Sequence, residues 1–347
     1  MKIVLYIAKK YSIPIFKPLV RFLDSSDHDY MFYLSDKVKK DLPKEWSKSK
    51  ILENLRSAKK YNSDFVLSSG NFVDFRIPGI KVQIFHGLGV EKPAHFKIRH
   101  FFDLYLTSGP FVTEKFMELR EDNNRYFEVR ETGWLKIDYI LGFDKDSYNY
   151  NIDIPSDKKI ILYAPTFSNK MESASQMIGK IKGLISKDEF WILKFHELMD
   201  KEVVAHFKRE KNILVVENYD ITPYLHIADI MISDTSSVVY EFMALNKPVI
   251  TIDTISRKDK GFNVLKIEDV KDKLTILKKD INILNSNIAK NIKEVNPYLD
   301  SSIAERTVKV LEDVLKEGGL PKKNKPLNLF RKLQIIYHSI FKKGYMR

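Results

Sequence analysis

The 347-residue sequence contains no cysteine. This absence excludes disulfide bonds, zinc–thiolate sites, iron–sulfur clusters and cysteine nucleophiles, and it suits a chain that needs no oxidising compartment. Long apolar runs are also missing. The first strand-like segment, residues 3–8, is too short for a signal-peptide core and far shorter than the roughly 20 apolar residues of a membrane-spanning helix. We therefore expect a soluble, cytoplasmic protein.

Nucleotide-binding and metal-binding signatures are missing as well. The sequence has neither a Walker A motif nor GxGxxG, so it predicts neither ATP hydrolysis nor a dinucleotide cofactor. Asp27 and Asp29 flank His28 in a polar turn, and we interpret this cluster as solvated rather than metal-binding. We expect no cofactor and no metal held by the protein's own side chains.

Charge is unevenly distributed. The chain carries 58 basic and 46 acidic residues and a net charge of +12, of which the acid-free segment 321–347 contributes +8. A nucleic-acid-binding protein is the weaker hypothesis, because the charge is concentrated at one end and no RNA- or DNA-binding motif is present. Leu329, Leu333, Ile336 and Ile340 recur at helical spacing in this tail. This stripe predicts an amphipathic helix that lies on an anionic membrane surface or packs on the N-terminal domain.

Short apolar strands alternate with helical patterns from end to end, which indicates an α/β fold with parallel sheets. We predict two Rossmann-like domains, residues 1–145 and 155–318, followed by a basic tail, 319–347. The polar interval 142–158 separates the domains. The predicted strands span 2–8, 31–34, 65–68, 82–85, 104–107, 126–131, 159–163, 190–195, 213–216, 230–233 and 248–252.

Parallel sheets bind ligands beyond the carboxyl ends of their strands, and two histidines follow predicted strands. His86 comes after 82–85 and is followed by Gly87, which lets the chain turn. His196 comes after 190–195. An imidazole at such a place can accept a proton at neutral pH. The alternative is that each ring merely satisfies a turn carbonyl.

The segment 228–245 contains the sharpest signal. A buried strand is predicted to end at Ser233 and a helix to start near Ser236, with Asp234 or Thr235 as its N-cap. Free N–H groups and hydroxyls at a helix start suit a phosphate ligand. The alternative is that Thr235 and Ser236 only cap the helix. A capping role is likewise the alternative for Thr166 in the loop after 159–163.

Several motifs then resemble the CDP-glycerol glycerophosphotransferase family, which includes teichoic-acid primases and polymerases and capsule-making relatives. The resemblance covers roughly residues 80–315. It rests on HGLG at 86–89, ETGWLKID at 131–138, LYAPTFS at 162–168, FHE at 195–197, ADIMISDTSSVVYEFMALNKPVI at 228–250 and PYLDSSIAERTVKVL at 297–311. The family's fold is GT-B, with two Rossmann-like domains and no metal bound by the protein.

The resemblance implies the transfer of a polyol phosphate from a CDP-activated donor to a hydroxyl of a glycan or lipid-linked acceptor, with release of CMP, in the synthesis of cell-surface polymers. His86 matches the general base, His196 a group that holds the diphosphate, and Ser236 and Ser237 the pair that binds phosphate. The inner face of the cell membrane is then the expected place of action. The other predicted substrate-binding residues are Gly87, Thr166, Ser233, Asp234, Thr235 and Glu241.

The motifs also depart from the family pattern, and these departures leave alternatives open. HGLG, FHE and Thr235 stand where many relatives have other residues. The transferred group is therefore open between glycerol phosphate, ribitol phosphate and a sugar phosphate. The segment 234–237 also resembles the phosphate-binding segment of UDP-N-acetylglucosamine 2-epimerases, so a GT-B sugar-nucleotide enzyme is the main alternative. For the polyol-phosphate transferase, the two histidines and the serines are expected to converge on one pyrophosphate.

Overall fold

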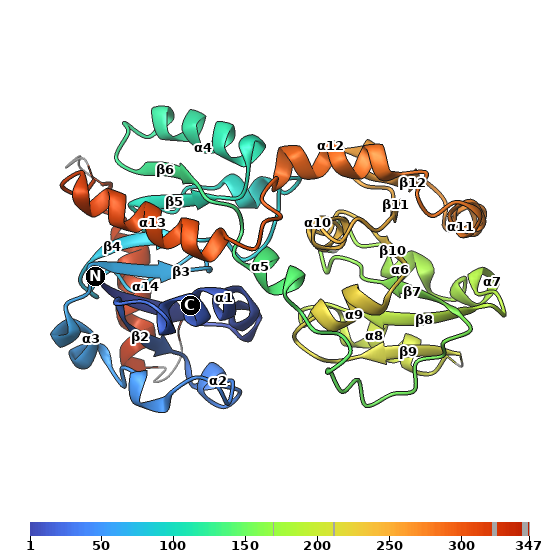
Figure 1. Ribbon diagram of the computed structural model, residues 1–347, viewed down its shortest axis with the longest axis horizontal. Coiled ribbons are helices and arrows are strands. Elements are labelled where there is room, and N and C mark those ends of the chain that lie inside the picture. Colours follow the sequence, from blue (N-terminus) through green and yellow to red (C-terminus); the bar gives the residue numbers. More distant parts are fainter. Residues whose placement is uncertain (169, 211, 321–324, 342–345, 347) are drawn as a thin grey trace. The chain divides into compact units, whose positions relative to one another are not determined.

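The computed structural model describes residues 1–168, 170–210, 212–320, 325–341 and 346. The chain divides into two compact units. Unit 1 comprises Met1–Gly87, Phe96–Tyr139 and Asn296–Arg347, and unit 2 comprises Leu88–His95 and Ile140–Val295. Each unit contains one six-stranded parallel sheet flanked by helices (Figure 1), so the predicted α/β class with two parallel sheets is confirmed.

The sheet of unit 1 has the strand order β2-β1-β3-β4-β5-β6. Its strands are β1 (Lys2–Ile7), β2 (Asp29–Leu34), β3 (Phe65–Ser68), β4 (Ile80–Gln83), β5 (Leu104–Thr107) and β6 (Glu128–Glu131). Its helices are α1 (Ile13–Asp24), α2 (Asp36–Lys39), α3 (Leu55–Tyr61), α4 (Pro110–Asp122), α13 (Ile303–Lys316) and α14 (Leu329–Phe341), while α5 (Lys136–Leu141) leads into unit 2. Strands β1, β3 and β5 are buried along nearly their whole length, because helices cover both faces; in Figure 1, α13 lies in front of the sheet and α14 behind it.

The sheet of unit 2 has the order β12-β11-β10-β7-β8-β9. Its strands are β7 (Lys159–Tyr163), β8 (Glu189–Lys194), β9 (Ile213–Val216), β10 (Ile230–Ser233), β11 (Val249–Ile252) and β12 (Phe262–Val264). Its helices are α6 (Ala174–Met177), α7 (Ile181–Leu184), α8 (Lys201–Lys208), α9 (Thr222–Ile227), α10 (Val238–Met243), α11 (Val270–Lys279) and α12 (Asn285–Val295). The sequence did not predict β12, which is three residues long. Gly261 precedes it, and a Cβ there would lie 2.2 Å from the Val249 carbonyl oxygen, so only glycine permits this approach.

The two units differ from the predicted domains in two places. Residues 88–95 pack with unit 2 rather than unit 1, and the chain from Asn296 onward packs with unit 1 rather than with residues 155–295. The second difference has a direct cause. The Asn296 side chain accepts a hydrogen bond from the Trp134 backbone N–H (2.8 Å), and Asp138 accepts one from the N–H of Ala304 (2.8 Å) at the start of α13. Helix α13 also packs against α1.

Helix α14 confirms that the tail forms a helix, but it packs on unit 1 through a face other than the predicted stripe. Ile335 is buried, and the side chains of Lys325 and Asn328 donate hydrogen bonds to the carbonyls of Phe101 and Arg99 (2.8 and 2.7 Å). The stripe itself is mostly exposed, with exposed fractions for Leu329, Leu333 and Ile340 of 63%, 62% and 57%. Five of the eight basic tail residues, Lys322, Lys323, Lys342, Lys343 and Arg347, lie outside the described residues.

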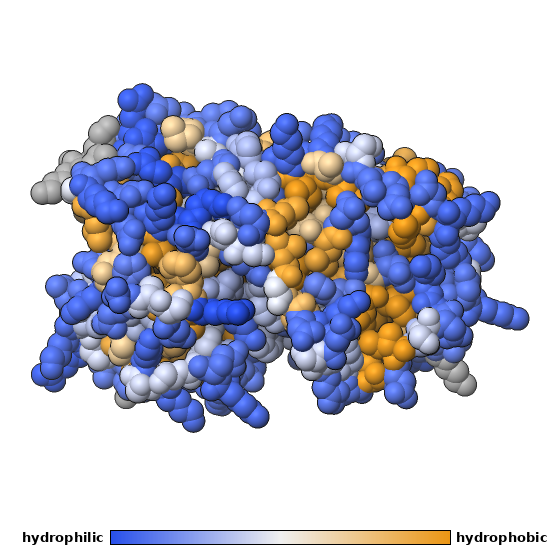
Figure 2. Space-filling view, in the orientation of Figure 1, coloured by the Kyte–Doolittle hydropathy of each residue, from blue (hydrophilic) through white to orange (hydrophobic). Residues whose placement is uncertain are grey.

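Polar residues cover much of the surface. On the face drawn in Figure 2 hydrophilic residues predominate, and apolar side chains are exposed in patches between them. In the part of the chain that the structure describes, no helix combines the length and the apolar character that crossing a bilayer requires.

Candidate functional site

The first group of candidate residues lies at the carboxyl ends of the strands of unit 1. His86 is exposed three residues beyond β4, and its ring lies 5.7 Å from that of Tyr11. The preceding residue, Phe85, has φ = 55°, a left-handed conformation that costs a non-glycine residue free energy. It is held there because its carbonyl accepts a hydrogen bond from the Trp134 indole (3.2 Å) and its ring packs on Phe116 (5.1 Å). The backbone that presents His86 is therefore fixed by its surroundings.

Gly133 orients Trp134 for this contact. It has φ = 90°, and a Cβ on it would come within 2.9 Å of the Ile303 side chain on α13. Only glycine satisfies both constraints. The ETGW turn thus connects α13 to the backbone beside His86.

The second group lies in unit 2, and its centre is the fully buried carboxylate of Asp234 after β10. One oxygen accepts a hydrogen bond from the Thr166 backbone N–H (2.8 Å), and the other accepts two from the N–H and hydroxyl of Ser173 (2.9 and 3.0 Å). Burial raises the pKa of Asp234 to about 6, although these hydrogen bonds and the charge of Lys92 act in the opposite direction. The sequence suggested Asp234 as a helix N-cap, and this is wrong. Its carboxylate instead connects the loop after β10 to the segment after β7 through these hydrogen bonds.

Three further predicted residues contact this centre or its neighbours. The Thr166 hydroxyl accepts a hydrogen bond from Lys92 Nζ (2.9 Å), and it does not cap the next helix, α6, whose N-cap residue is Ser173. Ser233 donates to the Ala164 carbonyl (2.6 Å), and Thr235 Oγ1 accepts from the Ile255 N–H (3.2 Å). The hydroxyls of Ser233 and Thr235 thus bind parts of the protein itself, and their contact with a ligand stays a prediction.

Ser236 and Ser237 differ from these neighbours. Both are partly exposed, and the helix that follows starts at Val238, with Ser237 as an N-cap residue whose side chain makes no capping hydrogen bond. The Ser237 hydroxyl therefore does not cap the helix. Among the residues that the structure describes, no hydrogen bond to either hydroxyl is found, so both are available to a ligand. Glu241, on α10, is buried.

Glu91 and Lys92 were not identified from the sequence. The Glu91 carboxylate forms a buried ion pair with Lys260 and accepts hydrogen bonds from the hydroxyls of Tyr240 and Thr254 (2.9 Å each). These contacts hold residues 88–95 on unit 2 and place Lys92 beside Thr166. Burial lowers the pKa of Lys92, although the charges of Asp234 and Glu91 oppose this. The signal in the sequence was two adjacent charges directly after an apolar segment that ends in Val90.

His196 is exposed two residues beyond β8, and its ring stacks on Phe167 at 4.2 Å. Its Nδ1 atom accepts a hydrogen bond from the Leu198 backbone N–H (3.1 Å). Because Nδ1 is an acceptor, the neutral ring carries its proton on Nε2. His196 can therefore donate a hydrogen bond to an anionic ligand through Nε2–H.

Within unit 2, Thr166 and Asp234 are thus connected by a hydrogen bond, and Ser233 and Thr235 flank Asp234 in the chain. His86 with Gly87 belongs to unit 1 and His196 to unit 2. That the two histidines and the serines face one pyrophosphate stays a prediction. No group of three or more His, Asp or Glu side chains that would suit a metal ion occurs among the described residues.

Two parallel six-stranded sheets with polar groups at their strand ends define the fold class of this protein. Solved structures of the same fold class align with the chain. The wall teichoic acid polymerase TagF aligns with a TM-score of 0.68 and 16% identity over 91% of this chain and 90% of that one. A putative UDP-N-acetylglucosamine 2-epimerase from Listeria monocytogenes aligns with a TM-score of 0.65 and 15% identity over 94% and 99%. The fold is of the GT-B type.

The sequence comparison identifies the family within this class. Residues 91–263 match the family model of CDP-glycerol:poly(glycerophosphate) glycerophosphotransferases, and the chain belongs to that family. The teichoic acid glycerol-phosphate primase of Bacillus subtilis (strain 168) is 30% identical over 161 residues, which are 44% of this chain and 42% of that protein. The match thus spans less than half the length of this relative.

Proposed function

We propose that this protein transfers a polyol phosphate from a CDP-activated donor to a hydroxyl of a glycan or lipid-linked acceptor, with release of CMP, in the synthesis of a cell-surface polymer. One observation carries the proposal. Within the residues that match the family model, Lys92 and two available serine hydroxyls lie in loops that Asp234 and Glu91 hold at the strand ends of unit 2. Cationic and hydroxyl donors of this kind suit a diphosphate.

The groups of unit 2 act on the donor in this proposal. Ser236, Ser237 and Lys92 bind the diphosphate, and the Nε2–H of His196 donates a further hydrogen bond to it. Donors that are already fixed before the reaction stabilise the charge that develops on the leaving phosphate without reorganisation, and each is commonly worth a factor of ~10²–10³ in rate. Phe167 supports His196 through their ring stack (4.2 Å), so this donor is held in one orientation.

His86 acts on the acceptor. It accepts the proton of the acceptor hydroxyl while that oxygen bonds to the β-phosphorus of the donor. The bond from this phosphorus to the bridging oxygen breaks, and CMP leaves with the electron pair. The products are a phosphodiester, CMP and a protonated imidazole that returns its proton to water. Positioned general-base catalysis contributes ~10²–10⁴ in rate.

Replacement of His86 by alanine tests this proposal. We expect CMP release from CDP-glycerol, measured in the presence of acceptor, to fall by a factor of ~10²–10⁴ while the circular dichroism spectrum is unchanged. His206→Ala is the matched control, because His206 is an exposed histidine on α8, outside the proposed site. Near wild-type turnover by His86→Ala would remove His86 from its proposed role.

Assays with different substrates identify the transferred polyol and test the epimerase alternative. CDP-glycerol and CDP-ribitol are compared for CMP release with the same acceptors. The likeness to an epimerase structure is a likeness of fold at 15% identity, whereas the family match favours the transferase. Conversion of UDP-N-acetylglucosamine to its epimer without any acceptor, together with no CMP release from either CDP-polyol, would favour the alternative.

We also propose that α14 binds an anionic membrane surface, where a lipid-linked acceptor resides. Leu333 and Phe330 are 62% and 73% exposed on this helix, and the segment 321–347 carries +8. Basic residues near an anionic surface contribute about 1 kcal/mol each. Phe330→Ser with Leu333→Ser is expected to reduce flotation with phosphatidylglycerol vesicles, and the control Leu265→Ser, at a 65% exposed leucine of unit 2, is not. Equal flotation of all three proteins would exclude this contact.

A further inference from the structure

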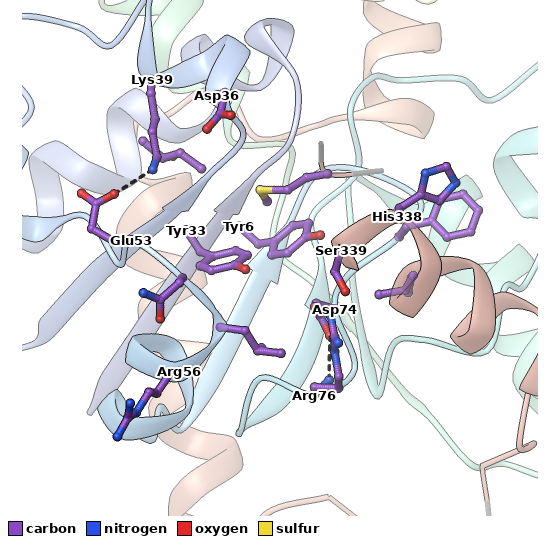
Figure 3. Close-up of a pocket in the computed structure, with 16 residues that line it drawn as sticks. Tyr6, Tyr33, Asp36, Lys39, Glu53, Arg56, Asp74, Arg76, His338 and Ser339 are labelled. Carbon is purple, nitrogen blue, oxygen red and sulfur yellow. Dashed lines mark hydrogen bonds and ion pairs between the residues drawn. The ribbon is translucent and has the colours of Figure 1, made fainter. Parts of the chain in front are cut away.

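A pocket of about 540 Å³ lies within unit 1, between the sheet and α14 (Figure 3). Its lining comes from β1, β2, α2, the start of α3 with the residues before it, the segment between β3 and β4, and α14, together with Met346. The described residues that line it do not include His86, Tyr11 or Trp134. The pocket is therefore distinct from the strand-end group around His86.

Tyr6 is the central polar group of this pocket. Its side chain is 5% exposed, yet its hydroxyl points toward Ser339 (Figure 3), and no hydrogen bond joins it to another described residue. Register pairs Tyr6 of β1 with Tyr33 of β2, so both rings lie on the same face of the sheet and stack at 5.7 Å. Buried phenols in proteins usually have a hydrogen-bond partner, and a ligand in the pocket can supply one to Tyr6.

The charges that line the pocket are balanced. Asp74 is 4% exposed and accepts two hydrogen bonds from the Arg76 guanidinium (2.9 and 2.7 Å), and Lys39 is paired with Glu53 at 2.9 Å. Asp36 and Arg56, at the rim, are exposed and opposite in sign. Among the described residues, the lining thus has no excess positive charge for a phosphate and no excess negative charge for a cation, which favours an uncharged ligand.

We propose that this pocket binds a neutral saccharide unit. A pyranose ring presents apolar C–H groups to stacked aromatic rings and hydroxyls to polar edges, and this pocket offers both: the Tyr6–Tyr33 stack, its two phenol hydroxyls and the Asp74–Arg76 pair. The volume lies within the usual range for small-molecule sites. The inference goes beyond the proposed transfer reaction, because its ligand is neither the CDP-activated donor nor the hydroxyl that faces His86.

Binding to the full-length chain tests the proposal. N-acetyl-D-glucosamine, D-glucose and D-galactose are titrated without donor and followed by saturation-transfer NMR, and at least one is expected to bind. Tyr6→Phe removes one hydrogen bond and keeps the ring, so binding should weaken about 2- to 12-fold, and Tyr33→Phe provides a second variant in case the first fails to fold. Tyr105→Phe is the matched control, because Tyr105 is a buried tyrosine of the same sheet with no described partner for its hydroxyl and no part in the pocket.

Three results would overturn the inference. The first is that none of the three sugars binds the wild type. The second is that Tyr6→Phe and Tyr33→Phe, both folded, bind as tightly as Tyr105→Phe. The third is that inorganic phosphate or CDP-glycerol displaces the sugar competitively. Sugar binding is also measured with His86→Ala, and it should persist there, so that failure of the transfer proposal and failure of the saccharide proposal are told apart.

Discussion

Replacement of Glu91 by glutamine removes one charge of a buried ion pair and keeps the size of the side chain. The side chains of Lys260 and Glu91 are 0% and 4% exposed. Loss of one partner from such a pair typically costs about 3–5 kcal/mol, because the other charge stays buried without compensation. The amide retains one oxygen and can still accept a hydrogen bond from Tyr240 or Thr254. We therefore expect the free energy of unfolding of unit 2 to fall by about 3–5 kcal/mol.

The effect should also depend on pH. Burial lowers the pKa of Lys260, and the charge of Glu91 opposes this; without Glu91 the pKa in the folded state falls further. The unfolded chain then holds a proton that the folded chain releases, so the stability of Glu91→Gln should rise as the pH increases above neutrality. The deficit relative to the wild type is accordingly largest near pH 7 and smaller near pH 9.

Urea unfolding, followed by circular dichroism and by hydrogen exchange of residues 88–95, measures this loss. Asp259→Asn breaks the exposed Lys290–Asp259 pair (62% and 45% exposed) of the same unit and should cost less than about 1 kcal/mol. Glu91→Gln combined with Lys260→Met removes both charges and should recover much of the loss. A single variant within 1 kcal/mol of the wild type, or no better stability in the double variant, would refute the reasoning.

Two further changes probe the backbone and the buried carboxylate. Gly133→Ala should destabilise unit 1 by about 1–3 kcal/mol, because φ = 90° and the 2.9 Å approach to Ile303 both penalise a Cβ; a thermal-unfolding midpoint equal to that of the wild type would contradict this. The raised pKa of Asp234, about 6, means that between pH 4 and 6 the folded state holds a proton that the unfolded state has lost. Stability should therefore fall by up to about 3 kcal/mol as pH rises through this range. Asp234→Asn should lack this component, and equal slopes in urea titrations of both proteins would exclude it.

Most of the fold was predictable because the signals are local. Strands such as β7, β9 and β10 were predicted at their observed bounds, since each is an apolar run between polar segments. Strands β7 and β10 are also buried along nearly their whole length, as parallel strands between layers of helices are. Strand β12 was not predicted, because three residues are too few to show the alternation of apolar and polar side chains that indicates a strand, and the preceding Gly261 favours a turn. The histidines were predictable as strand-end residues for the same local reason, and His86 and His196 do lie just beyond β4 and β8.

Other features depended on packing between distant residues. Helix α14 was predicted from its period, but which face it buries depends on contacts with a distant segment, such as the hydrogen bond that Arg331 donates to the Arg99 carbonyl (3.2 Å). The role of Asp234 was likewise misassigned, because N–H groups more than 60 positions away occupy its oxygens.

By itself, then, the sequence determined the strand–helix alternation, the family motifs and the positions of polar residues after strands. Tertiary structure alone decided which of these polar groups are already bonded within the protein. It also joined Glu91 to Lys260, 169 positions apart, and created the pocket beside Tyr6. The physical reason is that burial obliges polar groups to find partners, and close packing between segments far apart in the chain determines which partners are within reach.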